Sequence, residues 1–145
     1  MNMNKHEFKL PESIAWHFST VLRVRISDIN FAGHLAHDRV VSLLHEARAR
    51  LFQSHDWTEL NVAGASIIVA DLHVRYLHEA FFGEELRIDI AIINLRNRSC
   101  DIIYRVSRPA DGITLAEAST GVVFFDYTAR KSTAIPETFR ACFTD

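Results

Sequence analysis

The sequence predicts an α+β domain in which a curved antiparallel β-sheet wraps one long helix. Three observations support this fold class: one amphipathic helical segment over residues 38–54, five strand-like segments, and short polar breaks between the last four of them. Strands joined by short turns pair antiparallel, and a helix with one apolar side is buried by packing on one face of such a sheet. We expect the 145 residues to form a single domain, 1–145.

The composition excludes several classes of protein. Hydrophobic residues make up 48% of the chain and charged residues 23%, which predicts a folded core. The formal net charge of −2 lacks the basic excess typical of nucleic-acid binding, so we expect no nucleic-acid partner. No apolar run has the length of a signal peptide or membrane span, and Cys100 and Cys142 fit free thiols in a reducing compartment. We therefore expect a cytoplasmic protein with no membrane partner.

The first strand is expected over residues 18–26, after a polar, loose N-terminal arm at residues 1–15. Apolar and basic residues alternate there as in a half-buried strand. The expected inner and outer sets are Leu22, Val24, Ile26 and Arg23, Arg25.

The helix over residues 38–54 follows from apolar residues at intervals of three and four, which gather on one side of a helix. This stripe consists of Val40, Val41, Leu43, Leu44, Ala47, Leu51 and Phe52. The other side is expected to carry Arg39, Ser42, Glu46, Arg48, Arg50 and Gln53. Asp38, or His37 before it, is expected to cap the first turn, because a polar side chain can accept its free N–H groups.

After the helix we expect a brief helical turn at residues 57–60 and then four strands. They are expected over residues 65–78, 85–95, 99–108 and 113–127. In the strand at 65–78, the side chains expected to face inward are Leu72, Val74 and Tyr76, and those expected to face outward are Asp71, His73 and Arg75. In the strand at 85–95, one face is expected to carry Leu86, Ile88, Ile90 and Ile92. Asp111-Gly112 predicts the hairpin between the last two strands, and the tail should hold one helical turn.

The loop between the first strand and the helix gathers polar residues around a glycine. These residues are Asp28, Asn30, Gly33, His34 and His37. The N–H groups of a first helical turn point out of the helix, and they can hold a carbonyl oxygen that is gaining negative charge. The sequence therefore predicts a site where this loop meets the helix.

This stretch also resembles a known family, the hotdog-fold thioesterases of the 4-hydroxybenzoyl-CoA thioesterase type. Their signature is a D-x-D-x-x-G-H loop followed by a helix with an E-E-A-R-like segment. The matching residues here are Asp28, Asn30, Gly33, His34 and then His45-Glu46-Ala47-Arg48. The resemblance extends more loosely over nearly the whole chain. It implies a hotdog fold, an acyl-CoA substrate, no cofactor beyond the substrate's own coenzyme A, and a homodimer or homotetramer with active sites at the dimer interface.

Asn30 departs from the family pattern, in which this position often holds the aspartate that acts as nucleophile or base. An amide cannot be deprotonated for either role, but it can donate to a carbonyl or accept a hydrogen bond from water. The alternative is an asparagine that merely closes a turn.

Resembling thioesterases with an amide at this position pair it with a carboxylate fifteen residues further on, from the opposite protomer. In this chain that position is His45, followed by Glu46. A histidine titrating near neutrality is a credible base for activating water. The alternative for His45 is a helix residue with its contacts at the dimer interface, and the alternative for Glu46 is a solvated or ion-paired helix residue. By the same match, the backbone N–H at His37, rather than its side chain, polarises the thioester carbonyl.

The other loop residues have supporting roles in this hypothesis. Gly33 should allow close approach of a neighbour or ligand, and His34 should line the pocket. Asp28 fits a substrate-binding or a structural role, the latter by accepting backbone hydrogen bonds. The spacing of His34, His37 and His45 does not indicate a metal site, so none is expected.

Basic and apolar residues elsewhere complete the expected binding site. Arg96, Arg98 and Ser99 match positions that contact the nucleotide end of coenzyme A in resembling enzymes, and guanidinium groups pair well with phosphates. The alternative is a charged strand edge that prevents aggregation. Arg130 and Lys131 form a weaker second basic pair. The residues proposed for the acyl or aryl pocket are Leu44, Trp57, Leu60 and Ile68.

The resulting hypothesis is an acyl-CoA thioesterase that uses water to hydrolyse an acyl- or aryl-CoA. One alternative is a non-catalytic acyl-CoA-binding protein, which the missing aspartate favours. Another is an enoyl-CoA hydratase or dehydratase, because residues 30–34 loosely resemble the H-F-x-G-H loop of that class, although its chemistry needs a base where Asn30 stands. The sheet's unpaired edges also favour dimerisation.

Overall fold

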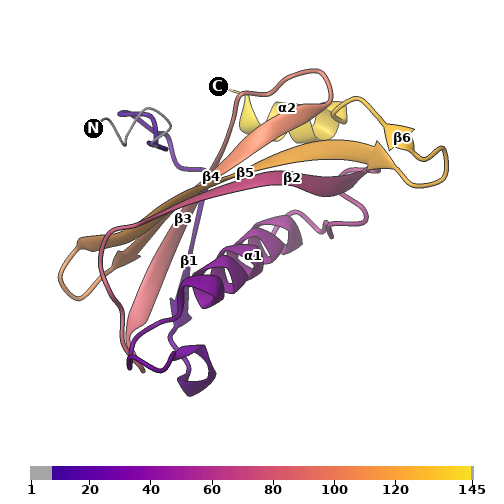
Figure 1. The fold of residues 1–145 in the computed structure, drawn as a ribbon. Coiled ribbons are helices and arrows are strands. Elements are labelled where there is room, and N and C mark those ends of the chain that lie inside the picture. The colour runs from indigo at the N-terminus through magenta and orange to yellow at the C-terminus, as the bar shows by residue number, and fades with distance from the viewer. Residues whose placement is uncertain (1–7, 145) are drawn as a thin grey trace, which may run out of the picture.

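The computed structural model describes residues 8–144, in which six strands form one antiparallel sheet that curves around a long helix (Figure 1). The strands are β1 (Phe18–Arg23), β2 (Ser66–Tyr76), β3 (Glu85–Ile93), β4 (Ser99–Arg108), β5 (Ile113–Asp126) and β6 (Lys131–Ser132). Their order across the sheet is β1-β3-β4-β5-β2, and β6 pairs with the end of β5. The long helix is α1 (His37–Gln53), and a short helix, α2 (Glu137–Phe143), follows the sheet. The predicted fold class is confirmed.

The core lies between α1 and one face of the sheet. Strand side chains alternate between faces, so the apolar positions of β3 share the side that α1 covers, as predicted. Leu86, Ile88, Ile90 and Ile92 of β3 are each at most 2% exposed. From α1 the buried residues are Val40, Leu43, Leu44, Ala47, Arg48, Leu51 and Phe52.

Two expectations about α1 are wrong. Neither His37 nor Asp38 caps the helix: Ala36 is the N-cap, it makes no side-chain hydrogen bond, and Asp38 lies inside the first turn. The helix begins after Ala36 because the Asp28 carbonyl accepts the Ala36 N–H and holds the backbone of Ala36 in an extended conformation. Arg48, expected on the outer side, is only 6% exposed because it lies beside polar partners inside the domain.

The first strand is shorter than predicted. β1 ends at Arg23, and Ile26–Asp28 forms a single 3-10 turn, η1. The turn forms because the Asp28 carboxylate accepts the Arg25 N–H at 2.8 Å, which draws the chain back on itself. As a result Ile26 is 70% exposed, and its predicted place on the buried face is wrong.

β2 is an edge strand whose inner face is incompletely covered. Leu72, Val74 and Tyr76 lie opposite the buried residues Thr120, Ala118 and Ala116, so the predicted facing is confirmed. Leu72 and Tyr76 are nevertheless 40% and 49% exposed, because no strand pairs with the outer edge of β2 within the described residues.

Two predicted connections take a different form. Residues 57–60 form no helical turn; isolated bridges between Thr58 and Asn61 and between Val62 and Ala65 fold this segment instead. The β4–β5 hairpin is present, but its turn begins at Arg108, whose carbonyl accepts the Gly112 N–H at 2.7 Å. Of the two predicted turn residues, only Gly112 has a positive φ, +75°. The hairpin therefore has a longer loop than a two-residue primed turn.

Residues 8–17 cross the sheet face that α1 does not cover (Figure 1). The ring of Phe8 stacks on His73 of β2, with centroids 5.8 Å apart, and the guanidinium of Arg105 lies 4.9 Å from the Trp16 ring centre. The described part of the expected arm is thus in contact with the sheet, while residues 1–7 lie outside the described residues.

Candidate functional site

A cavity of about 200 Å³ lies at the N-terminus of α1 and contains three of the predicted site residues. Asn30 and His34 enter it from the loop after η1, and His37 from the first turn of the helix. Its lining is completed by residues of α1, the end of β2 and the inner sheet face: Leu35, Val40, Tyr76, His78, Glu79, Ala80, Val106, Leu115 and Ala116. The structure therefore brings the predicted loop and helix start together at one concave site.

Asn30 organises the loop at this cavity. Its Oδ1 accepts the N–H of Ala32 at 3.0 Å and of His34 at 3.3 Å, and its carbonyl accepts the N–H of Gly33 at 3.1 Å. These bonds are those of the turn-closing asparagine considered above. These hydrogen bonds occupy the amide oxygen. The amide nitrogen, which is the donor of the side chain, can bind a ligand in the cavity.

The N-terminus of α1 supplies backbone donors next to Asn30. The first N–H groups of an α-helix have no partner within the helix, and the Ala36 N-cap provides no side-chain acceptor for them. The hydroxyl of Tyr76 donates to the His37 carbonyl at 2.8 Å and so ties this turn to the end of β2. Partial burial, together with the negative charge of Asp38, raises the pKa of Tyr76. The phenol therefore stays protonated and can keep donating.

The remaining loop residues have different surroundings. His34 lines the cavity, and its Nε2 lies 3.6 Å from Oε1 of Glu79. Gly33 has a φ of +88° and no atom within 4 Å of where a Cβ would stand. Backbone conformation explains this glycine, since no neighbour within the described residues approaches it; the approach of a ligand stays a prediction. Asp28 is 1% exposed, binds Arg25, and is not among the residues lining the cavity.

His45 and Glu46 line another cavity, of about 600 Å³, beside the C-terminal half of α1. His45 lies eight positions after His37, a rise of about 12 Å along the helix. The Glu46 carboxylate pairs with Arg50 at 2.6 Å, one turn away, and Nε2 of His45 lies 3.2 Å from Oε1 of Glu59. Within one subunit, the structure does not bring either residue to the Asn30 cavity.

Arg96, Arg98 and Ser99 lie at the far end of the sheet from Asn30. Ser99 lies seven positions before Val106 in β4, a span of about 23 Å, and Val106 lines the Asn30 cavity. Arg96 pairs with Asp101 at 3.0 Å, and Arg98 donates to the carbonyl of Ser132 at 2.9 Å. Burial raises the pKa of Asp101, but hydrogen bonds from Arg96 and Asn94 outweigh it and hold the pKa below its usual value.

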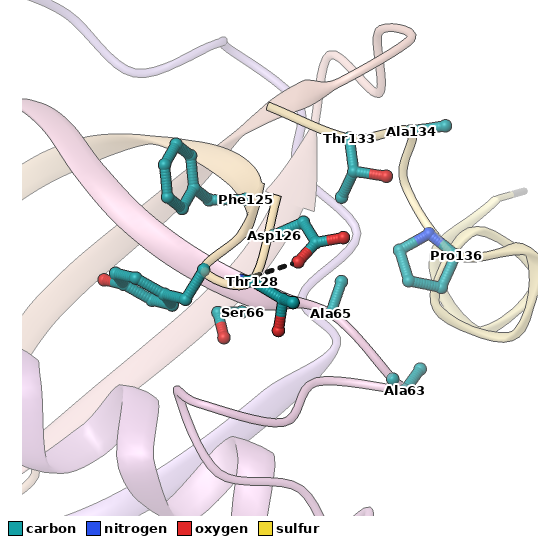
Figure 2. A pocket seen from close by; sticks show the side chains of 11 residues that line it. Ala63, Ala65, Ser66, Phe125, Asp126, Thr128, Thr133, Ala134 and Pro136 are labelled. Carbon is teal, nitrogen blue, oxygen red and sulfur yellow. Dashed lines mark hydrogen bonds between the residues drawn. The ribbon is translucent and has the colours of Figure 1, made fainter. Parts of the chain in front are cut away.

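Figure 2 shows a polar cavity of about 430 Å³ between the start of β2 and the end of β5. Asp126 faces it, but its Oδ1 accepts the N–H groups of Thr128 and Ala129 at 2.9 and 3.1 Å and thus shapes the turn. No predicted site residue lines this cavity, which is formed by Ala63, Gly64, Ala65, Ser66, Phe125, Asp126, Tyr127, Thr128, Thr133, Ala134 and Pro136.

The four residues predicted for an acyl pocket do not form one. Leu44 is 1% exposed in the core, Trp57 lines the His45 cavity, and Leu60 is 74% exposed at the surface. Ile68 lies on β2, 37% exposed. Within one subunit these residues therefore line no common cavity, because they lie on different elements: α1, the connection after it, and β2.

Two further observations concern the described residues as a whole. Within residues 8–144, no three histidine, cysteine, aspartate or glutamate side chains are grouped so that they could hold a metal ion. No helix in the same part of the chain is long and apolar enough to cross a membrane.

Sequence reasoning did not identify Tyr76, Glu79 or Glu59 as neighbours of the candidate residues. The inward facing of Tyr76 at the end of a strand was a usable signal for its place near the loop. Glu59 carried no such signal, because it lies in an irregular connection whose path depends on tertiary packing.

Comparison with solved structures identifies several proteins of similar fold. A 1,4-dihydroxy-2-naphthoyl-CoA thioesterase from Synechocystis superposes with a TM-score of 0.80 and 20% identity, covering 88% of this chain and 96% of its own. A thioesterase-superfamily protein from Jannaschia has a TM-score of 0.79 and 25% identity, with coverages of 88% and 81%. A Staphylococcus aureus protein in complex with CoA has a TM-score of 0.77 and 16% identity, with coverages of 91% and 85%. No curated protein matches this chain.

The family comparison covers most of the sequence. A model of the thioesterase-like superfamily matches residues 24–143, which include the loop, α1 and strands β2 to β6. The sheet wrapped around α1 is the hotdog fold of the thioesterase structures that it resembles. The chain therefore belongs to the thioesterase-like superfamily.

Proposed function

We propose that this protein is an acyl-CoA thioesterase that hydrolyses an acyl- or aryl-CoA at the α1 N-terminus. The observation that carries the proposal is that Asn30 and His37 line one cavity at a helix start whose first N–H groups lack a side-chain cap. Membership of the thioesterase-like superfamily supports it, as does the CoA-thioesterase description of a structural neighbour.

In the proposed mechanism, the thioester carbonyl oxygen binds at the N–H of His37. Negative charge that develops on this oxygen is stabilised there, because the backbone donors are fixed before the reaction begins. The amide nitrogen of Asn30 donates to the carbonyl or orients the attacking water. No cofactor other than the substrate's coenzyme A takes part in this mechanism.

The base in this proposal comes from a second copy of the chain. His45 lies in a different cavity from His37 and is about 12 Å further along α1, so His45 of its own subunit is poorly placed for this carbonyl. His45 of the partner subunit, or Glu46 of the partner subunit, removes the proton from water. Within residues 8–144 no strand pairs with the outer edge of β2, and this supports a dimer in which the sheet continues between subunits.

The outer basic residues have a proposed role in binding. Arg96, Arg98 and Ser99 bind the nucleotide end of coenzyme A, and Asp28, Gly33 and His34 shape the loop around the acyl end. The exposure of Arg96 and Arg98 supports this role, although both guanidinium groups also have partners within the chain.

A panel of acyl- and aryl-CoA compounds, assayed for release of free thiol, tests the function. We expect turnover with at least one member and a drop in kcat of roughly 100-fold in Asn30→Ala and in His45→Ala. Binding without thiol release would instead indicate an acyl-CoA-binding protein. Hydration of an enoyl-CoA without thiol release would indicate a hydratase.

A further inference from the structure

Glu59 connects the surface of α1 with the buried interior of the domain. Its Oε1 accepts a hydrogen bond from Nε of Arg48 at 3.0 Å and lies 3.2 Å from Nε2 of His45. Arg48 also donates through Nη1 to the hydroxyl of Tyr104 at 3.1 Å, and that hydroxyl lies 2.8 Å from Oγ1 of Thr120. A continuous set of polar contacts therefore runs from the sheet interior to His45.

These contacts hold the Glu59 carboxylate in one place. Arg48 is 6% exposed, and Tyr104 and Thr120 are 0% and 3% exposed, so the inner part of the set is enclosed by the core. Burial lowers the pKa of Arg48, but Tyr104 and Glu59 outweigh that effect and raise it, so the guanidinium remains charged. The Glu59 backbone is bound as well, because its carbonyl accepts the N–H of Ile67 at 3.0 Å.

His45, by contrast, is accessible to a substrate. Its side chain is 61% exposed and lines the cavity of about 600 Å³, together with Glu59, Trp57 and Phe52. A carboxylate beside one ring nitrogen favours the tautomer with the proton on that nitrogen, and it steadies the ring orientation. A half-buried carboxylate, held by the buried Arg48, thus contacts one nitrogen of an exposed imidazole ring.

We propose that Glu59 is the positioning residue for His45 in the thioester hydrolysis proposed above, on which this inference rests. With Nε2 directed at the Glu59 carboxylate, Nδ1 is the basic nitrogen that faces the cavity. The carboxylate also balances the charge of the imidazolium that forms during the reaction.

Water and the His45 imidazole account for every proton transferred in the hydrolysis. Nδ1 takes one proton from water as the water oxygen bonds to the thioester carbonyl carbon, and the carbonyl oxygen becomes an oxyanion. The tetrahedral intermediate then collapses, its carbon–sulfur bond breaks, and the imidazolium returns the proton to the sulfur. The products are the carboxylic acid and coenzyme A as the free thiol, with no oxidant or reductant required.

Kinetics of Glu59→Ala test the positioning role. We expect kcat for thiol release to fall about tenfold with KM nearly unchanged, because the substrate-binding groups remain while the base loses its orientation. In a His45→Ala background, the same substitution should have almost no further effect on kcat. A full, additive loss in that background would show that Glu59 acts independently of His45.

A spectroscopic measurement reports on the contact without relying on turnover. At a pH where the ring is neutral, the ¹⁵N shifts of the His45 imidazole should show a protonated Nε2 and an unprotonated Nδ1. In Glu59→Ala the two tautomers should mix. Unchanged nitrogen shifts in Glu59→Ala would overturn the proposal.

Ile92→Val is the control for a loss of stability. Ile92 is 2% exposed on β3 and lies outside these contacts, so the variant should lower Tm but leave kcat unchanged. Glu59→Ala with wild-type kcat would refute the positioning role alone. No thiol release by the wild-type protein would refute the proposed function as well.

Discussion

The two cysteines differ in reactivity because one lies in the core and the other on the surface. Burial, with a smaller contribution from the charge of Asp101, raises the pKa of the Cys100 thiol to about 12. Cys142 is exposed on α2. Because the thiolate is the reactive form, Cys100 should be unreactive toward a disulfide reagent at pH 8 in the folded protein.

We therefore expect 5,5′-dithiobis(2-nitrobenzoate) to label one thiol per folded chain and two after denaturation in guanidinium chloride. Cys142→Ser should abolish the labelling of the folded protein, whereas Cys100→Ala should leave it intact. Rapid labelling of a second thiol in the native state would mean that the interior of the sheet opens readily.

At the level of the elements, the β2–β5 pair depends on a contact between a side chain and a glycine. The register between these strands shifts between Val69 and Asp71, and Oδ1 of Asp71 accepts the Gly121 N–H at 2.8 Å. A Cβ at position 121 would lie 2.5 Å from that oxygen. Asp71, which was predicted to face outward, thus also binds the backbone of the neighbouring strand.

Gly121→Ala should displace the Asp71 carboxylate and lower the free energy of unfolding by about 1 kcal/mol, the value of one hydrogen bond. Since the same bond is absent in Asp71→Ala, adding Gly121→Ala to that variant should cost much less. Urea unfolding of the two single variants and the double variant measures this coupling. Additive effects would exclude the contact as the reason for a glycine at this position.

At the level of the whole molecule, the two edges of the sheet provide a direct test of the proposed dimer. β1 and β2 are the two edge strands, and they expose apolar side chains of similar extent: Val21 is 48% and Leu72 40% exposed. Leu72→Lys should place a charge at the proposed subunit interface and convert the dimer into monomers. Val21→Lys, on the opposite edge, should leave the dimer intact.

Light scattering after size-exclusion chromatography at fixed concentration measures the mass of each variant. If the base comes from the partner subunit, thiol release should fall together with the dimer fraction in Leu72→Lys and stay unchanged in Val21→Lys. A fully active monomer would rule out a catalytic contribution from a second subunit.

Most of the fold could be predicted because the spacing of apolar residues along the sequence indicates whether a segment is a helix or a strand and which of its faces is buried. The pattern in residues 38–54 predicted α1, and the alternation in residues 85–95 predicted β3 with its inner face. One error occurred where a side chain bends the chain locally. Asp28 binds the Arg25 N–H and ends the first strand early.

The candidate site was predictable only in the part that is continuous in sequence. Asn30, His34 and His37 lie within one loop and one helix start, so their proximity follows from short chain distances, and the structure places them in one cavity. The separation of His45 from that cavity follows from its place about 12 Å further along the same helix. What the sequence did not show is the contact of His45 with Glu59, which comes from an irregular segment outside the helix.

The sequence alone determined the order of the elements, the buried faces of helix and strands, and the loop that meets α1, because periodicity and neighbouring residues are local properties. Only the tertiary structure decided that Arg48 is enclosed, that Glu59 lies beside His45, and that β2 lies at the edge of the sheet formed by the described residues. Those outcomes depend on contacts between segments far apart in the chain, and packing, rather than local pattern, selects such contacts.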